Sequence, residues 1–550
     1  MANIVVYGSG WAGIAAAAKA ARFAPDATVH LISPYPVAKL GGISTIGGQN
    51  FIDLRKYNGK LVQGGSFGDW YSYLGNRQYY NTDSFASYLN TYLTQYSNIR
   101  IHHKYDIESV VTATNPYRIT YITIRSISRN SSNIIVWGNS TDTIPCNMVI
   151  DASDEGRIAR TVNSAVITGR FDWPSAKVTS TEHNNKLAKQ QAATLMFKVK
   201  GVTDYTNTST DDMDKLKYAD GEQTMMYWGG SKSFSNPSSA MYAFNEKHKD
   251  AGYMLKPLNA ARNGTDSEEF WVNMLMIFNV DGRCNSRDVG TSMYPTNRLS
   301  GVYNTDQAYV NAVNFLNNAE NQQEILDALH ELPGFENAEF VKKNGSVVTG
   351  ETLYIRETVH MSKDAASIAN GTENTNYGLT TNAAHNAGAT SSTGGDSGNY
   401  ATRIGIGFYQ SDIHPYEPAD CIDGTVSDTR SVTVGTNNYV WAYDSYSKMR
   451  GDLLFNSEEP DNPAYLPYSI LKTNYVANLI LAGYAVNMSS FAWGEMRVFS
   501  NQAVIGDAAG VTAAYCYNNS KYPVYLGTSD ISVIQTNLNT IGAKLTKENL

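Results

Sequence analysis

The sequence has 550 residues, of which 43 are lysine or arginine and 51 are aspartate or glutamate, so the net charge is −8. This length exceeds what one compact core needs and predicts two or three structural units. The acidic balance gives no reason to expect a nucleic-acid partner or binding to an anionic membrane surface.

A strand, a glycine-rich turn and an alanine-rich helix occupy the start of the chain. The turn has the spacing G-x-G-x-x-G at Gly8, Gly10 and Gly13, which in this order of elements indicates dinucleotide binding. We expect Gly8 to make the tight turn, Gly10 to let the backbone approach a pyrophosphate, and Gly13 to let the helix pack on the sheet. The helix N-terminus, at Trp11 and Ala12, should direct its N–H groups at that pyrophosphate.

The second strand, residues 28–32, ends without the acid that usually follows this motif. A carboxylate at this place normally binds the ribose hydroxyls. Here the position is Ser33, and Asp26 comes before the strand. One hydroxyl cannot hold a ribose diol as a carboxylate does, so we expect the nucleotide to be held more by backbone or less tightly.

Residues 39–53 contain two Gly-Gly pairs joined by small residues. Backbone of this kind can lie against a flat ligand. The apolar residues in the same stretch argue against a flexible loop in water. The residues concerned are Gly41, Gly42, Ser44, Thr45, Gly47 and Gly48.

These motifs together resemble the FAD-dependent oxidoreductases of the glutathione-reductase-like superfamily. The run L-G-G-x-x-T-x-G-G after the second strand is most similar to the large bacterial family called FAD-dependent oxidoreductase. The resemblance implies FAD as cofactor, with the 39–53 loop along the isoalloxazine and the pyrophosphate. It also implies a strand at 148–151 that closes on FAD, with Ala152 beside the nucleotide and Asp151 as a structural neighbour or a cap of the strand.

Between these parts the pattern predicts a helix at 84–96, a strand at 98–102 and an antiparallel ribbon covering about 118–137. Ile107, just before the ribbon, is included among the expected cofactor contacts. We expect residues 1–197 to form the first part of the FAD-binding domain.

Residues 198–464 are expected to form an inserted substrate or cap domain. Residues 270–280 are apolar enough for a buried strand or helix, and residues 309–329 have a helical pattern. Residues 371–399 are rich in Asn, Thr, Gly and Ser, which predicts a long loop.

Two segments of the insertion resemble family motifs that end in polar residues. In 353–360, Arg356 and Glu357 match the family strand, whereas His360 replaces an arginine. In 404–414, the family pattern ends at His414. Arg356 could bind an anionic substrate group, and His414 or His360 could act as an acid or base. A structural ion pair of Arg356 with Glu357 or Asp412, and a histidine bonded into a turn, explain the residues equally well.

The C-terminal part, residues 465–550, is expected to complete the FAD-binding domain. Residues 503–514 are predicted as a strand that runs into a small-residue helix. The resemblance places Asp507 on the ribitol chain of the flavin and the helix N-terminus at the pyrimidine end of the ring. The cofactor contacts expected here are Gly506, Asp507, Gly510 and Val511.

Other features set limits on partners and location. No run approaches the roughly 18 apolar residues of a membrane span, and the N-terminus lacks the pattern of a signal peptide, so we expect a cytoplasmic protein. Four scattered cysteines exclude a disulfide framework, though not one disulfide, and we expect no metal site.

The sequence therefore predicts an α/β protein with a three-layer, Rossmann-like FAD-binding domain and an inserted α+β domain. The expected function is hydride transfer between a small organic substrate and flavin. Two alternatives stay open: a flavoprotein-like structural or assembly protein, and a redox-neutral flavoenzyme such as an isomerase or hydratase. The electron partner could be oxygen, a quinone or a protein, and the sequence is compatible with a homo-oligomer.

Overall fold

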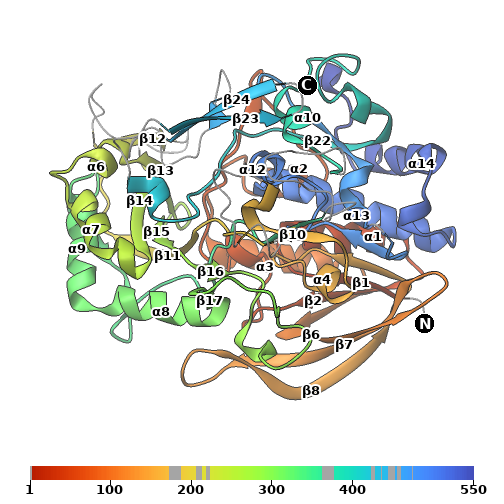
Figure 1. Ribbon diagram of the computed structural model, residues 1–550, viewed down its shortest axis with the longest axis horizontal. Helices are drawn as coiled ribbons and strands as arrows, with labels where there is room; N and C mark the ends of the chain where they lie inside the picture. Colours follow the sequence, from red (N-terminus) through yellow and green to blue (C-terminus); the bar gives the residue numbers. More distant parts are fainter. Residues whose placement is uncertain are drawn as a thin grey trace.

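A five-stranded parallel sheet forms the centre of the molecule (Figure 1). The computed structural model describes residues 3–172, 182, 187–205, 213–217, 223–361, 377–422, 428–434, 437–443, 453–454, 460–473 and 475–550. In order across the sheet, the strands are β27 (Leu479–Leu481), β9 (Met148–Asp151), β1 (Asn3–Tyr7), β2 (Thr28–Ser33) and β5 (Ile99–His103). All neighbouring strands pair in parallel, and every residue of β1 is buried, as expected for a sheet covered on both faces. The predicted βαβ unit is confirmed.

Helices cover one face of this sheet and a β-ribbon covers the other (Figure 1). The helices are α1 (Trp11–Phe23), α3 (Thr82–Thr94) and α13 (Phe499–Asn518); the ribbon strands are β6 (Tyr105–Ala113), β7 (Arg118–Arg129) and β8 (Ile135–Pro145). Ile119, Ile122 and Ile124 of the ribbon are fully buried in the same core as β1. The predicted three-layer α/β domain is therefore confirmed.

The predicted strand at the start of 503–514 is wrong, because the whole segment lies inside α13. All its residues are buried, and a helix that is apolar on every side has the same composition as a buried strand. The spacing of its glycines gives the physical reason for the helix. A Cβ atom at Gly506 or Gly510 would lie 2.2 or 2.3 Å from the carbonyl oxygen of Ala12 or Ala16 in α1, so the two helices touch along backbone.

The inserted domain is built on a six-stranded antiparallel sheet. In order, its strands are β12 (Met213–Lys217), β13 (Thr224–Gly229), β14 (Tyr253–Arg262), β15 (Phe270–Ile277), β11 (Ala193–Lys200) and β18 (Glu339–Phe340). Strand β15 resolves the alternative at 270–280 in favour of a strand, and all its residues are buried. Side chains of the helices α7 (Ala240–His248), α8 (Thr305–Asn317) and α9 (Ala319–His330) join this sheet in a second core.

The helical run predicted at 309–329 is two helices rather than one. Asn318 separates α8 from α9, and its side chain accepts hydrogen bonds from the backbone N–H groups of Glu320 and Asn321. An asparagine in this role is an N-cap, which starts a new helix and ends the old one. The apolar periodicity continues across the break, so periodicity alone does not show it.

The expected limits of the insertion, 198–464, stay a prediction, and the two cores suggest a different division. The second core contains residues from Ala192 onward, whereas Val359, Ile404 and Leu466 pack in the first core. Strands β22 (Arg403–Gly407) and β26 (Ala464–Pro467) pair with each other. We infer that the described residues near 359, 404 and 466 belong with the FAD-binding part, because they pack in its core.

Residues 371–399, predicted as a long loop, are partly anchored. Residues 371–376 lie outside the described residues, and the remainder includes the short helix α10 (Thr381–His385). Asp396 accepts a hydrogen bond from the ammonium group of Lys547 at 2.8 Å, and both side chains are fully buried. This pair ties the segment to the C-terminal end of the chain.

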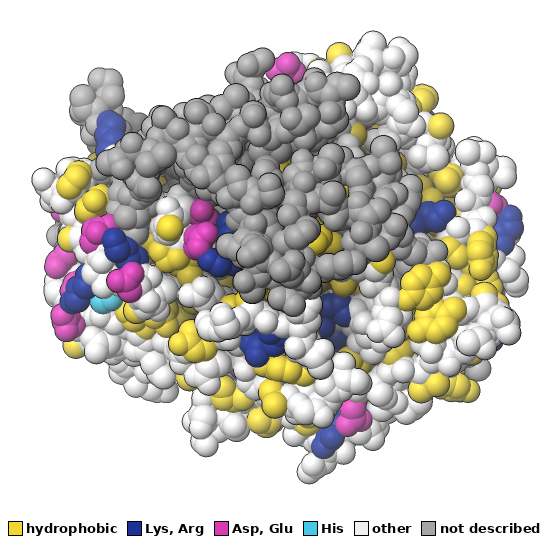
Figure 2. Space-filling model, in the orientation of Figure 1, with side chains coloured by type: hydrophobic (Ala, Val, Ile, Leu, Met, Phe, Trp, Pro, Cys, Tyr) yellow, Lys and Arg dark blue, Asp and Glu magenta, His cyan; other side chains and the backbone are white. Residues whose placement is uncertain are grey.

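Charges of both signs alternate on the exposed side of the inserted domain. Figure 2 shows basic and acidic side chains interspersed where α7 and α9 lie; Lys247 of α7 pairs with Glu320 and Glu324 of α9 at 2.5 Å. Across the described residues, no helix combines the length and apolar character needed to cross a membrane. The four cysteines, Cys146, Cys284, Cys421 and Cys516, are free thiols.

Gly510→Ala should destabilise the protein although alanine favours helices. The added methyl would lie 2.3 Å from the Ala16 carbonyl oxygen, and the overpacking should lower the free energy of unfolding by about 1–3 kcal/mol. The matched control is Gly68→Ala in α2 (Ser66–Tyr73), where a Cβ meets nothing within 4 Å. That change should stabilise by up to about 1 kcal/mol. Urea unfolding of both variants tests the opposite signs; equal effects would contradict the backbone contact between α1 and α13.

Candidate functional site

The three glycines of the first turn have the geometry that their spacing predicts. Gly8 has φ of +102°, and a Cβ there would lie 2.4 Å from the carbonyl oxygen of Ala152. At Gly13 a Cβ would lie 1.8 Å from the Gly8 carbonyl oxygen, so α1 packs tightly on the turn. A Cβ at Gly10 would meet no atom within 4 Å, which leaves open space in front of α1.

The N-terminus of α1 faces this space without a side-chain cap. Its N-cap residue is Gly10, and the first hydrogen bond made within the helix is from the N–H of Ile14. The N–H groups at Trp11, Ala12 and Gly13 are therefore available to an anion, and the helix dipole favours one. This open cradle fits the pyrophosphate of a dinucleotide.

A cavity runs from this turn between the sheet, the ribbon and the inserted domain. We call it the Gly8 cavity; its lining includes Gly8, Gly10, Tyr35, Ala152 and Asp154. Burial raises the pKa of the Asp154 carboxyl to about 7, and the Tyr35 hydroxyl donates a hydrogen bond to it at 3.4 Å. Sequence reasoning missed Asp154, although it follows the predicted strand end by only a few residues.

Two residues predicted to contact the nucleotide, Ser33 and Ile107, bond to other residues of the protein instead. Ser33 is fully buried, and its hydroxyl lies 2.7 Å from that of Ser9. The backbone N–H of Ile107 bonds to the Asp106 side chain at 2.7 Å, and its carbonyl accepts from the guanidinium of Arg157. The polar groups of Ser33 and Ile107 therefore have partners already, and neither residue lines the Gly8 cavity.

The loop with two Gly-Gly pairs is folded against the turn and the insertion. Trp11 donates from Nε1 to the Ser44 hydroxyl at 2.7 Å, and the Thr45 hydroxyl donates to the Leu40 carbonyl at 2.5 Å. A Cβ at Gly42 would lie 3.4 Å from the Cα atom of Gly10. The first pair, Gly41 and Gly42, is thus next to the pyrophosphate cradle.

The second pair of this loop meets the inserted domain. A Cβ at Gly48 would lie 2.5 Å from the Trp271 ring of β15, and the Gly47 carbonyl contacts Gly350. Gln49, the next residue of the loop, lines a second cavity, which is described below. The loop thereby runs from the open space at α1 to that cavity.

Asp507 lies two turns inside α13, away from both cavities. Its carboxylate accepts from the backbone N–H of Ser66 at 2.8 Å and from the Ser66 hydroxyl at 2.5 Å, and it lies 4.0 Å from the Lys19 ammonium group. Burial raises its pKa to about 6. These contacts, like those of Gly506 and Gly510, favour a role in joining α13 to α1 and α2. Val511 is fully buried in the same core.

A second cavity brings Arg356 and His414 together. We call it the Arg356 cavity; its lining includes Arg356, His414, Tyr354, Asp412 and Arg497. Val498 and Phe499 line it as well, so the N-terminus of the 20-residue α13 opens onto it with no side-chain cap. The sequence predicts that a helix N-terminus near Gly506 lies at the flavin. The observed N-terminus of α13 is at Phe499, seven residues earlier.

Arg497, Asp412 and His414 form a chain of polar contacts on one wall. Arg497 donates from Nη2 to Asp412 Oδ2 at 2.6 Å and from Nη1 to the Tyr354 hydroxyl at 2.8 Å. His414 Nε2 lies 3.8 Å from Asp412 Oδ1. Local sequence gives no role for Arg497, because its pairing with Asp412 joins segments 85 residues apart.

His360 is not part of this cavity. It lies in β21 (Val359–Met361) and is fully buried, with Nε2 2.8 Å from Glu357 Oε1. Neither ion pair considered for Arg356 forms, since Glu357 bonds to His360 and Asp412 binds Arg497. His360 is therefore best explained as a structural histidine.

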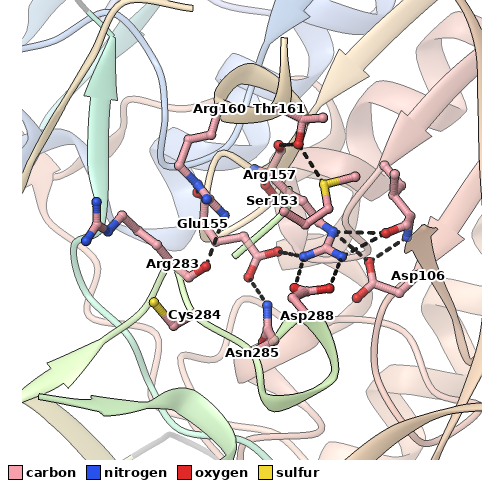
Figure 3. A network of polar contacts seen from close by, with 12 residues as sticks. Asp106, Ser153, Glu155, Arg157, Arg160, Thr161, Arg283, Cys284, Asn285 and Asp288 are labelled. Atoms are coloured by element: carbon pink, nitrogen blue, oxygen red, sulfur yellow. Dashed lines mark hydrogen bonds and ion pairs between the residues drawn. The ribbon is translucent and has the colours of Figure 1, made fainter. Parts of the chain in front are cut away.

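A buried ionic network joins the first domain to the insertion (Figure 3). Arg157 donates to both oxygens of Asp288, at 2.5 and 2.8 Å, and lies 3.4 Å from Asp106. Glu155 lies 3.5 Å from Arg157 and accepts from Asn285 at 3.0 Å. Glu155 and Asn285 also line the Gly8 cavity, so the network fixes one wall of it.

The family model described as FAD dependent oxidoreductase matches residues 3–538. The comparison with curated protein sequences gives no match. Similar solved structures include the myxobacterial chondrochloren halogenase CndH (10% identity, 63% of each chain covered, TM-score 0.29). The flavin-dependent halogenase CmlS matches at 10% identity over 65% of this chain and 50% of its own (TM-score 0.31). p-Nitrophenol 4-monooxygenase PnpA from Pseudomonas putida DLL-E4 matches at 9% identity over 66% of this chain and 69% of its own (TM-score 0.29).

The chain covers about half to two thirds of the length of these solved structures. The family match spans nearly the whole sequence, and the glycine turn, the uncapped α1 terminus and the open space before it form a cradle that suits the cofactor. The chain therefore belongs to the FAD-dependent oxidoreductase family, and its cofactor is FAD.

Proposed function

We propose that the protein transfers a hydride between a small organic substrate and FAD, with the substrate in the Arg356 cavity. The observation that supports this most directly is that Arg356, His414 and the N-terminus of α13 line one cavity. When bound, FAD supplies the hydride acceptor or donor. The residues of the chain then have to bind, orient and deprotonate the substrate.

Each group has a role that its chemistry allows. Arg356 holds the substrate through charge-assisted hydrogen bonds. The first turn of α13 stabilises negative charge that develops beside it. His414 moves a proton, because an imidazole can both accept and donate one. Asp412, held by Arg497, lies 3.8 Å from His414 and orients its ring. Phe51, Ile52 and Phe499 in the lining limit the access of water.

The first experiment is the visible absorption spectrum of the purified protein, before and after acid precipitation. A flavin spectrum released into the supernatant indicates non-covalent FAD, and colour that stays in the pellet indicates a covalent link. Anaerobic addition of candidate substrates then tests for bleaching of the flavin. Bound flavin that no substrate reduces would contradict hydride transfer and favour a redox-neutral enzyme; absence of flavin uptake would favour a structural role.

Arg356→Ala and His414→Ala should each slow flavin reduction while FAD stays bound. Loss of a positioned acid or base typically costs about 10²–10⁴-fold in rate, and loss of Arg356 should raise KM as well. The matched control is His330→Ala, because His330 lies in α9 and in neither cavity lining. Rapid-mixing kinetics with an identified substrate measure the rates. If both variants reduce flavin as fast as the wild type, the proposed roles are wrong and only the cofactor assignment stands.

A further inference from the structure

Arg356 is a deeply buried cation whose charge the described protein does not balance. It is 1% exposed. Its Nη1 donates to the Ala192 carbonyl at 3.2 Å, and its guanidinium lies 4.2 Å from the centre of the Tyr354 ring. Its Nε is buried and has no acceptor in the described part of the chain. Burial lowers the pKa of Arg356 to about 10, so the charge is disfavoured as the site stands.

The other arginines buried to a similar degree, at 6% exposure or less, are balanced by acids. They are Arg157, Arg170, Arg283 and Arg497. Each has a carboxylate oxygen within 4.0 Å, whereas no described carboxylate lies that close to Arg356. A buried charge normally requires a partner, so Arg356 lacks a group that the other four have.

The acids that line the same cavity are already engaged. Asp412 binds Arg497 at 2.6 Å, and Asp53 accepts from the Tyr409 hydroxyl and lies 3.2 Å from Arg55. Lys256 adds a further cation to the lining. Neither of the two acids, Asp53 and Asp412, is therefore left to pair with Arg356.

We propose that the substrate of this cavity is a small carboxylate, whose charged group binds the guanidinium of Arg356. A planar carboxylate matches the fork of a guanidinium, and its negative charge would balance the buried charge of Arg356. This inference rests on the proposed function, because it names the class of substrate for that site.

The test uses the FAD-loaded protein and a matched pair of probes. Benzoate and benzamide have nearly the same shape, and only benzoate is charged. Titration of each is followed by the change in the flavin absorption spectrum, with inorganic phosphate as a third probe. We expect saturable binding of benzoate with a Kd at least tenfold lower than that of benzamide. Phosphate should bind more weakly than benzoate, since the apolar side chains of the lining can pack against the benzoate ring and not against phosphate; tighter phosphate binding would overturn the carboxylate assignment.

Variants identify the residue. Arg356→Met should raise the Kd of benzoate at least tenfold and leave that of benzamide within twofold, and Arg356→Lys should lie between it and the wild type. Arg403→Met is the control, because Arg403 lies against Tyr400 and in neither cavity lining. Unchanged benzoate binding in Arg356→Met, or equal binding of the two probes by the wild type, would overturn the inference.

The outcomes separate this inference from the proposed function. A protein whose flavin is reduced by a neutral substrate, with no discrimination between benzoate and benzamide, contradicts only the anion. Benzoate binding that depends on Arg356, in a protein whose flavin no substrate reduces, contradicts only hydride transfer. Loss of FAD from Arg356→Met, without benzoate discrimination by the wild type, would show that Arg356 serves the cofactor.

Discussion

Arg157→Met is expected to lower the free energy of unfolding by about 3–5 kcal/mol, the usual loss when one partner of a buried ion pair is removed. The guanidinium is fully buried, binds both oxygens of Asp288, and donates to the Ile107 carbonyl (Figure 3). Methionine has a similar length and no charge. In the variant the buried carboxylates of Asp288 and Asp106 therefore lose the positive charge that Arg157 places beside them. Arg22→Met on the exposed part of α1 is the control and should change stability by less than about 0.5 kcal/mol.

The pH dependence of this loss has a definite sign. Burial alone would raise the pKa of Asp106, but Arg157 and Arg287 outweigh it and lower the pKa in the folded protein. A lowered pKa contributes stability above the unfolded value, about 3.9, which is lost as pH falls through the folded value. In Arg157→Met the larger of the two charges that oppose burial is gone and only Arg287 and the Tyr7 hydroxyl remain, so the pKa of Asp106 rises. The difference in stability between wild type and variant should therefore be largest near pH 7 and shrink toward pH 4.

Urea unfolding at several pH values measures this difference. A loss that stays constant from pH 7 to pH 4 would show that Arg157 acts through packing rather than through charge. The network also joins the insertion to the first domain, because Asp288 and Arg287 belong to the segment after β15 while Asp106 belongs to β6. A variant that unfolds in two steps would indicate that the domains have lost their coupling.

The parts of the fold that local sequence determines could be predicted. Gly8, Gly10 and Gly13 act through contacts within a few residues of the turn and with one neighbouring strand, so their spacing is informative by itself. The buried strands β1 and β9 and the ribbon follow from short apolar or alternating runs. The break at Asn318 was missed because a cap depends on backbone geometry, whereas periodicity reports only the buried face.

The candidate site depends on contacts between distant segments, and these could not be predicted in the same way. Arg356 was proposed from a resemblance, and the structure shows why it stands out: no described acid lies within ion-pair distance of it. The pairing of Arg497 with Asp412 is invisible in the sequence because nothing local links the two residues. The cofactor contact expected of Asp507 stays a prediction, since a glycine-rich motif inside a buried helix is shared by helix packing and by cofactor contact, and the observed bonds to Ser66 favour packing.

Gly10→Ala and Gly13→Ala should separate cofactor binding from folding within one turn. At Gly13 the new methyl would lie 1.8 Å from the Gly8 carbonyl oxygen, so this variant should lose at least about 3 kcal/mol of stability, or fail to fold, whether or not FAD is present. At Gly10 the methyl meets no protein atom within 4 Å, and φ of −75° suits alanine. The FAD-free Gly10→Ala protein should therefore unfold within about 0.5 kcal/mol of the wild type.

FAD binding should respond in the opposite way at Gly10. The methyl added in this variant would fill the space before the N-terminus of α1. The N–H groups at Trp11, Ala12 and Gly13 are expected to bind an anion in this space. We expect the Kd for FAD of Gly10→Ala to rise at least tenfold, about 1.4 kcal/mol. Fluorescence quenching of FAD by the FAD-free protein measures the Kd, and urea unfolding of the same samples measures stability. If Gly10→Ala binds FAD as tightly as the wild type, the pyrophosphate does not lie at this helix end, because any anion on those N–H groups must share its space with the methyl.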